Sequence, residues 1–225
     1  MAIVFRKPTT PGQRNISYNR QDLARKKPEK ALTTTLKKHA GRDRFGHISI
    51  RHRGGGNKRK YRIISALEKG PSASAEILAL EYDPNRSANI ALIRYETGTK
   101  AYILAASEMT TGQTVRAGVT APLVAGNRLP MSAIPRGFAI HDIALDPNRA
   151  GQIVRSAGSS AVIMAQEDDG RYAQVKLPYG EIRRVLATCY ATIGPSVTQT
   201  TARSATEKPV ASVTSAADHR SLASR

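Results

Sequence analysis

The sequence predicts an all-β protein made of two small β-barrels in tandem, with a basic extended arm before them and a disordered tail after them. Short segments that alternate or are rich in β-branched residues recur from about residue 60, and most are bounded by Gly, Pro, Asn or Asp. No long amphipathic helical pattern interrupts them. A breaker-rich stretch at residues 126–137 divides them into two groups.

Residues 1–60 are expected to be an extension that becomes ordered on a polyanion. Residues 1–70 hold 19 Lys and Arg against 4 Asp and Glu, whereas the remaining 155 residues hold 16 against 13. Such a segment, with many Pro and Gly and little apolar periodicity, cannot bury a core of its own. The alternative is a floppy tail with no defined partner.

Seven strands are expected. They cover residues 61–66, 76–82, 89–95, 100–105, 161–166, 172–177 and 181–186. Glycine-containing turns at 95–100, 166–171 and 178–180 join three pairs of them as hairpins. The first barrel is placed at 61–125 and the second at 126–194.

Residues 195–225 are expected to be disordered or ordered only by a partner. Of these 31 residues, 17 are Ser, Thr or Ala and none is aromatic. Such a composition cannot bury a core.

The net charge of +18 makes RNA, DNA or an anionic membrane the natural partner. We expect no membrane association, because no apolar run approaches the roughly 20 residues that cross a bilayer, and the first residues do not form a signal peptide. The single cysteine cannot form an internal disulfide and fits a reducing compartment. With no Trp and few Phe, stacking surfaces for bases are scarce, so contacts through phosphates are favoured.

Residues 51–62 form the most informative motif. Three consecutive glycines allow backbone N–H groups to approach phosphate oxygens, and four of the five residues at 58–62 are Lys or Arg that can neutralise phosphates. The motif is not a nucleotide-binding loop, because no Gly-Lys-Ser/Thr follows at the required spacing. A flexible basic linker is the alternative. The candidate RNA-binding residues here are Arg51, His52, Arg53, Gly54, Gly55, Gly56, Asn57, Lys58, Arg59, Lys60, Tyr61 and Arg62.

Residues 81–93 read as a strand, a tight turn and a second strand. Pro84 fixes φ and Asn85 tolerates unusual backbone angles, which is strong turn chemistry. Arg86 is expected at the turn tip, where it could reach a phosphate or a base edge. A hairpin with a solvated arginine explains the spacing equally well.

No catalytic, metal or cofactor site is expected. Cys189, His141 and Asp142 could supply a nucleophile, a base and an orienting acid, but a buried thiol and a strand-end histidine are strongly favoured. The histidines of the arm have no partners at metal-ligand spacing.

These motifs resemble those of the large-subunit ribosomal proteins of the L2 family, in its bacterial and organellar form. The resemblance covers about residues 1–194. Its most specific segments are 7–9, 51–60, 81–93, 102–105, 126–130, 151–158, 177–181 and 189–194.

The resemblance implies an OB-fold barrel at 61–125, an SH3-like barrel at 126–194 and a basic extension threaded into large-subunit ribosomal RNA. It also implies a structural role in subunit assembly and association, with other ribosomal proteins as partners. The residues that match the family's RNA-contacting motifs are Arg51, Arg53, Lys58, Arg59, Tyr61, Arg86 and Arg155. The alternative function is a free-standing RNA chaperone.

One departure concerns the C-terminal end. Family members continue into a glycine-rich basic extension near the peptidyl-transferase centre, which residues 195–225 do not resemble, so no role there is carried over. A separate chain that supplies this half, a reduced ribosome and a truncated product are the three explanations. We expect the chain in the ribosome of a bacterial cytoplasm, a mitochondrial matrix or a plastid stroma.

Overall fold

The computed structural model describes residues 2–14, 16–20, 23–66, 73–167 and 170–196. The chain divides into two compact units, residues 22–199 and a smaller unit that contains residues 1–21. In the smaller unit β1 (Ala2–Phe5) and β2 (Ser17–Arg20) form an antiparallel hairpin. No strand was predicted in this segment, which was expected to be part of an extended arm.

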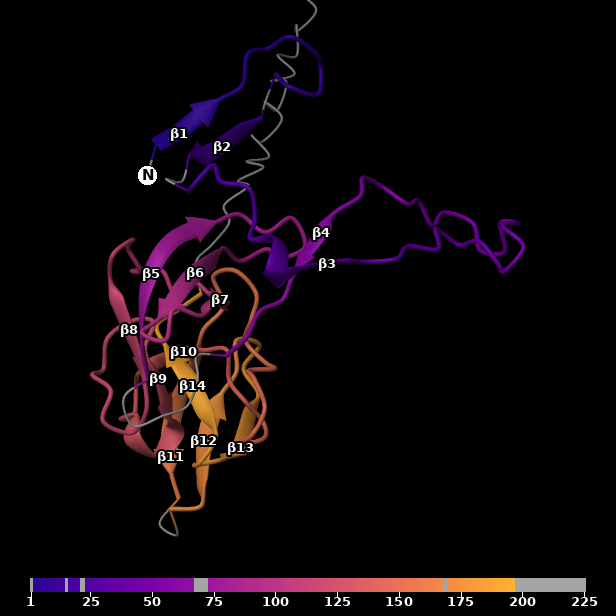
Figure 1. Cartoon of the computed structure of the whole chain (residues 1–225). Helices are drawn as coiled ribbons and strands as arrows, with labels where there is room; N and C mark the ends of the chain where they lie inside the picture. Colours follow the sequence, from indigo (N-terminus) through magenta and orange to yellow (C-terminus); the bar gives the residue numbers. More distant parts are fainter. Residues whose placement is uncertain (1, 15, 21–22, 67–72, 168–169, 197–225) are drawn as a thin grey trace, which may run out of the picture. The chain divides into compact units, whose positions relative to one another are not determined.

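The larger unit contains a continuous ten-stranded sheet with two halves (Figure 1). Four strands make the first half, in the order β8-β5-β6-β7. They are β5 (Ala73–Glu81), β6 (Ile90–Tyr95), β7 (Lys100–Leu104) and β8 (Thr114–Ala117). β5 pairs with both β6 and β8, and a tight turn at Gly98, whose φ is +81°, joins β6 to β7.

Six strands make the second half, in the order β13-β12-β11-β10-β14-β9. They are β9 (Arg128–Pro130), β10 (Ala139–His141), β11 (Ala161–Gln166), β12 (Tyr172–Lys176), β13 (Ile182–Leu186) and β14 (Tyr190–Ile193). One parallel pair, Ala117 with Arg128, connects the two halves of the sheet. The 3-10 helices η1 (Lys30–Leu32) and η2 (Met131–Ala133) are the helical elements of the described residues, and no helix among them is long and apolar enough to span a membrane.

The all-β prediction is confirmed, and all seven predicted strands overlap strands of the structure. The short strands β3 (Thr33–Thr35), β8, β9, β10 and β14 were not predicted. Each has three or four residues, which is too few for an alternating pattern to stand out. β9 also ends in Pro130, a residue that weakens any strand assignment.

Each half of the sheet encloses its own hydrophobic core. The second half buries one cluster that includes Leu129, Ile140 and Ile163. The first half buries two clusters, because β6 is buried on both faces: Ala91 and Ile93 face one cluster, and Ile90 and Leu92 face the other. A strand covered on both faces needs something to pack against its outer side.

The outer face of β6 and β7 is covered by chain from two other parts of the unit. Leu32 and Ile64 pack against it from the segments 29–35 and 60–66, here named the arm root, and Ala157 packs against it from a loop of the second barrel. Within the arm root, β3 (Thr33–Thr35) pairs with β4 (Lys60–Arg62). A backbone hydrogen bond from Ser65 N to Tyr102 O attaches this pair to β7.

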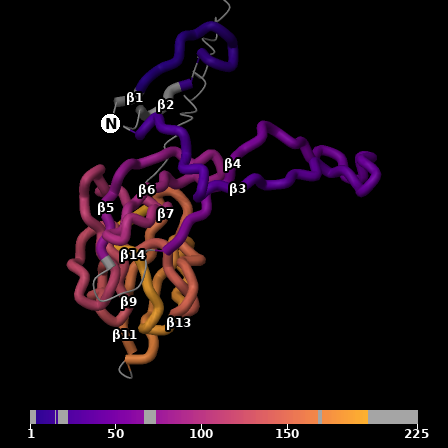
Figure 2. The backbone as a smooth tube through the Cα atoms, viewed as in Figure 1, coloured from indigo at the N-terminus to yellow at the C-terminus, as the bar shows by residue number. Residues whose placement is uncertain are grey.

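The basic arm, residues 36–59, leaves β3 and returns to β4. In Figures 1 and 2 it runs away from the barrels as two lengths of chain side by side. Lys38 Nζ donates to Gly55 O at 2.9 Å and holds the two lengths together. A Cβ on Gly41 would lie 2.4 Å from Ile50 O, so the close approach at this point requires glycine.

The first two residues of the predicted disordered tail, Pro195 and Ser196, are part of the fold. Pro195 O accepts a hydrogen bond from Ser107 N, and Ser196 N donates to Ser159 O. Ser196 is buried and pairs with Ala106 as a β-bridge. Residues 195 and 196 therefore join the first barrel to the second, and the rest of the predicted tail lies outside the described residues.

We expect Ile140→Ala to lower the free energy of unfolding by about 2–5 kcal/mol, because Ile140 has no exposed surface and lies in the core of the second barrel. Ile182→Ala on β13 is the matched control, since this isoleucine is 55% exposed and its truncation should change stability by less than about 0.5 kcal/mol. Urea unfolding followed by far-UV circular dichroism measures both. Equal losses would contradict the assignment of the core.

Candidate nucleic-acid interface

The Lys and Arg side chains at residues 51–60 are exposed to solvent. The fold does not require glycine at position 54, because an added Cβ would meet no described atom within 4 Å. Gly56 has a φ of +56°, which favours glycine, but an added Cβ would approach nothing closer than Lys38 Nζ at 3.9 Å. The glycines therefore leave an open backbone surface among cations, as close approach of a phosphate requires.

The C-terminal end of this motif is bound to the turn between β5 and β6. Arg59 Nη1 donates to Pro84 O at 2.8 Å, and Asn85 Nδ2 donates to Lys60 O at 2.8 Å. These bonds join two segments that the sequence analysis singled out separately. The motif and the turn therefore form one surface.

Arg86 lies in the turn between β5 and β6, as predicted, but its side chain is only 18% exposed, so the alternative of a fully solvated arginine is wrong. Its Nη2 donates to the hydroxyl of Tyr61 at 2.8 Å, and its guanidinium lies 5.4 Å from the centre of the Tyr61 ring. Its Nε lies 3.3 Å from Asp83 Oδ2. These contacts hold the guanidinium against the barrel.

Asp83 has no exposed surface, and Arg62 Nη1 lies 3.8 Å from its Oδ1. Arg62 itself is buried. Of the candidate cations, Arg62 therefore attaches the arm to the barrel, while Arg51, Arg53, Lys58 and Lys60 face solvent. The local sequence gave no sign of this division, because the partner Asp83 lies more than 20 residues further along the chain.

The arm root is fixed at a second point by Tyr102. The hydroxyl of Tyr102 accepts a hydrogen bond from Glu29 N at 3.0 Å and donates one to Glu81 Oε2 at 3.0 Å. Burial raises the pKa of Tyr102 to about 12, and burial also raises the pKa of the Glu81 carboxyl. Sequence reasoning missed this pair.

Arg155, the candidate in the second barrel, lies in a loop that reaches the β5–β6 turn. Ala157 N donates to Ser87 Oγ at 3.2 Å. Arg155 Nε lies 2.9 Å from Asp142 Oδ1, and its side chain is 27% exposed. The structure therefore brings the loop of Arg155 next to the turn of Arg86, in one continuous region.

Asp142 lies at the base of this loop and is paired with a second, fully enclosed arginine. Arg128 Nη1 donates to Asp142 Oδ2 at 2.8 Å, and Arg128 is only 1% exposed. The backbone around the pair is unusual, since φ is +49° at Asp142 and +56° at Val154. Gly151 is required, because an added Cβ would lie 2.3 Å from Asp142 O.

The three residues considered for nucleophilic catalysis have separate structural partners. His141 Nδ1 lies 2.6 Å from Gly194 O, and burial lowers the pKa of this imidazole. Asp142 faces the two arginines, and the buried Cys189 Sγ donates to Leu145 O at 3.2 Å. Among the described residues no group of three or more His, Cys, Asp or Glu side chains could hold a metal ion.

Asp142→Asn should lower the free energy of unfolding by about 3–5 kcal/mol, because it leaves Arg128 enclosed without a counter-charge. Asp146→Asn is the control, since the ion pair of Asp146 with Arg149 is exposed and should contribute less than about 1 kcal/mol. Chemical denaturation measures both variants. A small loss for Asp142→Asn would show that the buried pair does not stabilise the second barrel.

Tyr102→Phe should lower the free energy of unfolding by about 1–3 kcal/mol at neutral pH, because Glu29 N–H and Glu81 lose their partner. The pKa of Tyr102 is raised in the folded state, so its contribution is complete below about pH 10 and is lost as pH rises towards 12. The difference between wild type and variant should therefore shrink over that range. Urea unfolding at several pH values measures it, with Tyr179→Phe, at an exposed tyrosine, as the control.

Two family models match the chain in tandem. Residues 29–117 match the Ribosomal Proteins L2, RNA binding N-terminal domain, and residues 124–220 match the Ribosomal Proteins L2, C-terminal domain. The first match includes the arm root, the basic arm and the first barrel. The second match extends to residue 220, so it includes most of the segment that the sequence analysis had left outside the resemblance.

The matched domains agree with the two halves of the sheet, an OB-fold barrel followed by an SH3-like barrel, as the sequence analysis expected. The arm, with its exposed cations, lies inside the domain described as RNA-binding. This chain therefore belongs to the L2 family of ribosomal proteins and carries that family's RNA-binding domain.

Proposed function

We propose that this chain is a structural constituent of the large ribosomal subunit that binds large-subunit ribosomal RNA and supports subunit assembly and association. The observation that carries the proposal is an exposed cationic arm attached to a barrel by polar contacts, among them the ion pair of Arg62 with the buried Asp83. Its family places it in the ribosome. We propose the ribosome of a bacterium or an organelle, with other ribosomal proteins as neighbours.

The arm contributes affinity through its cations. Each phosphate that a Lys or Arg neutralises releases a condensed counterion, which favours binding at low salt. If about six to ten phosphates are contacted, the affinity should fall by roughly a thousandfold or more between low and moderate salt. The glycines at 54–56 allow the backbone to approach the same phosphates.

The first barrel orients the arm. The bonds of Arg59 and Asn85 fix the direction in which the arm leaves the first barrel. A deep A-form groove hides the bases of an RNA helix, so such a surface reads the shape and the sugar–phosphate backbone of its RNA. Arg86 and Arg155 belong to the supporting part of this surface, because each is held by a carboxylate of its own barrel.

The test is equilibrium binding of the full chain to protein-free large-subunit ribosomal RNA at several salt concentrations. The variant Arg51→Ala/Arg53→Ala should weaken binding and reduce the salt dependence by about one unit of slope for each lost phosphate contact. The control Arg171→Ala/Lys176→Ala removes two exposed cations of the second barrel and should leave the slope unchanged.

The outcomes distinguish three interpretations of how the chain binds RNA. A salt-independent binding constant, or equal effects of the two double variants, would overturn the proposed role of the arm. Binding of unrelated RNA as tightly as ribosomal RNA would favour the alternative, a free-standing RNA chaperone. A preference for ribosomal RNA that depends on Arg51 and Arg53 supports the proposal.

A further inference from the structure

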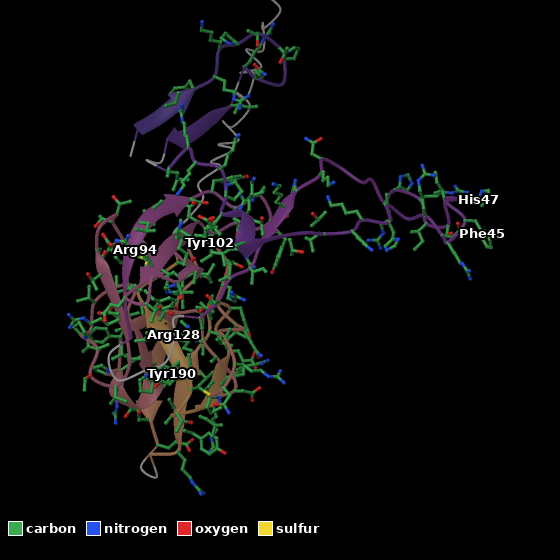
Figure 3. The ribbon with its side chains drawn as sticks, viewed as in Figure 1. Phe45, His47, Arg94, Tyr102, Arg128 and Tyr190 are labelled. Carbon is green, nitrogen blue, oxygen red and sulfur yellow. The ribbon has the colours of Figure 1, made fainter. Side chains whose placement is uncertain are left out.

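The end of the basic arm is a small, well-defined hairpin. Arg42 and Ile48 pair as an antiparallel bridge, and Asp43 N donates to His47 O at 2.9 Å. Residues 42–48 are here named the arm tip. In Figure 3 the labelled Phe45 and His47 lie at the end of the arm that is remote from the labelled barrel residues Tyr102 and Arg128.

The turn of the arm tip is closed by Asp43. Its Oδ1 accepts hydrogen bonds from Phe45 N and His47 N, both at 2.9 Å. Gly46 then supplies a φ of +85°. These bonds involve only the backbone of residue 45, so the fold of the tip sets no requirement for an aromatic side chain there.

Phe45 nevertheless presents a large apolar ring to solvent. It is 82% exposed, the highest value among the large hydrophobic residues described. Packing within this chain therefore does not explain why a phenylalanine stands at this position. An exposed aromatic ring at the end of a projecting segment has its area available for an external partner.

The charged residues near Phe45 in the sequence indicate which kind of partner the ring would meet. Arg42, Arg44, Arg51 and Arg53 are all within ten residues of Phe45, and Asp43 is the one acidic residue between 42 and 53. A polyanion is attracted to such a tip, whereas a basic protein surface is repelled. The tip also lies inside the family's RNA-binding domain.

We propose that Phe45 stacks on an unpaired nucleobase of the ribosomal RNA, and so adds a base contact to an arm that otherwise binds phosphates. Every base has a π-face, so such a contact accepts any unpaired base that the RNA fold exposes. Arg42 and Arg44, in the same hairpin, neutralise the phosphates that flank that base. This inference deepens the proposed function and rests on it.

Phe45→Ala in the full chain should weaken binding to protein-free large-subunit ribosomal RNA by roughly 5- to 150-fold, which is the range for loss of one stacked base. The salt dependence should stay unchanged, because no charge is removed. Phe45→Leu, which keeps apolar area but has no planar ring, should also weaken binding. Phe45→Tyr should retain it.

A second measurement reports the stacking directly. The chain contains no tryptophan, so Phe45→Trp creates a protein with a single indole at the arm tip. Titration with the same RNA should quench its fluorescence strongly. Tyr179→Trp, at a 69% exposed position in the second barrel, is the matched control and should change little.

The variants of Phe45 and of Arg51 with Arg53 separate the two proposals. If Phe45→Ala binds like the wild type while Arg51→Ala/Arg53→Ala binds weakly, the stacking contact is overturned and the proposed function stands. If neither variant affects binding, the proposed function fails as well. If RNA binding is retained but Phe45→Ala loses binding to a purified ribosomal protein, the ring serves a protein contact and the stacking proposal is wrong.

Discussion

The buried carboxylate of Asp83 determines how a strongly cationic segment is held to a small barrel. Like charges along the arm oppose any compact packing of the arm itself, so its attachment has to come from outside. Asp83 supplies two ion pairs, one to Arg62 of the arm root and one to Arg86 of its own turn. Because Asp83 has no exposed surface, solvent screens these pairs less than it would screen surface ion pairs.

The same attachment explains why β6 is apolar on both faces. A barrel strand with one face in water would alternate apolar and polar residues, but Ile90, Ala91, Leu92 and Ile93 are all completely buried. The arm root and the loop that carries Ala157 cover the outer face. The first barrel therefore packs against the arm root and against a loop of the second barrel at the same face. The candidate nucleic-acid interface is attached to both barrels in this way.

The sequence predicted the fold class and the longer strands well, because β-branched runs such as Ile90–Tyr95 lie between strong turn signals. It also singled out a set of candidate cations, Arg62, Arg86 and Arg155 among them, whose contact with RNA stays a prediction. It could not predict which of them are internal, since Arg62, Arg86 and Arg155 are placed by carboxylates whose positions depend on tertiary structure. The hairpin of β1 and β2 was missed because each strand has only four residues in a segment rich in breakers.

The residues that the fold does not explain carry the most information about function. Arg128 and Gly151 are accounted for by their internal contacts, since Arg128 pairs with Asp142 and a Cβ on Gly151 would clash with Asp142 O. Gly54 and Phe45 have no comparable internal reason, since one faces open space and the other contributes only its backbone to the arm tip. Both lie in the basic arm, where eight Lys and Arg stand against one acidic residue, so the proposed RNA, which needs close approach and a planar contact, accounts for both.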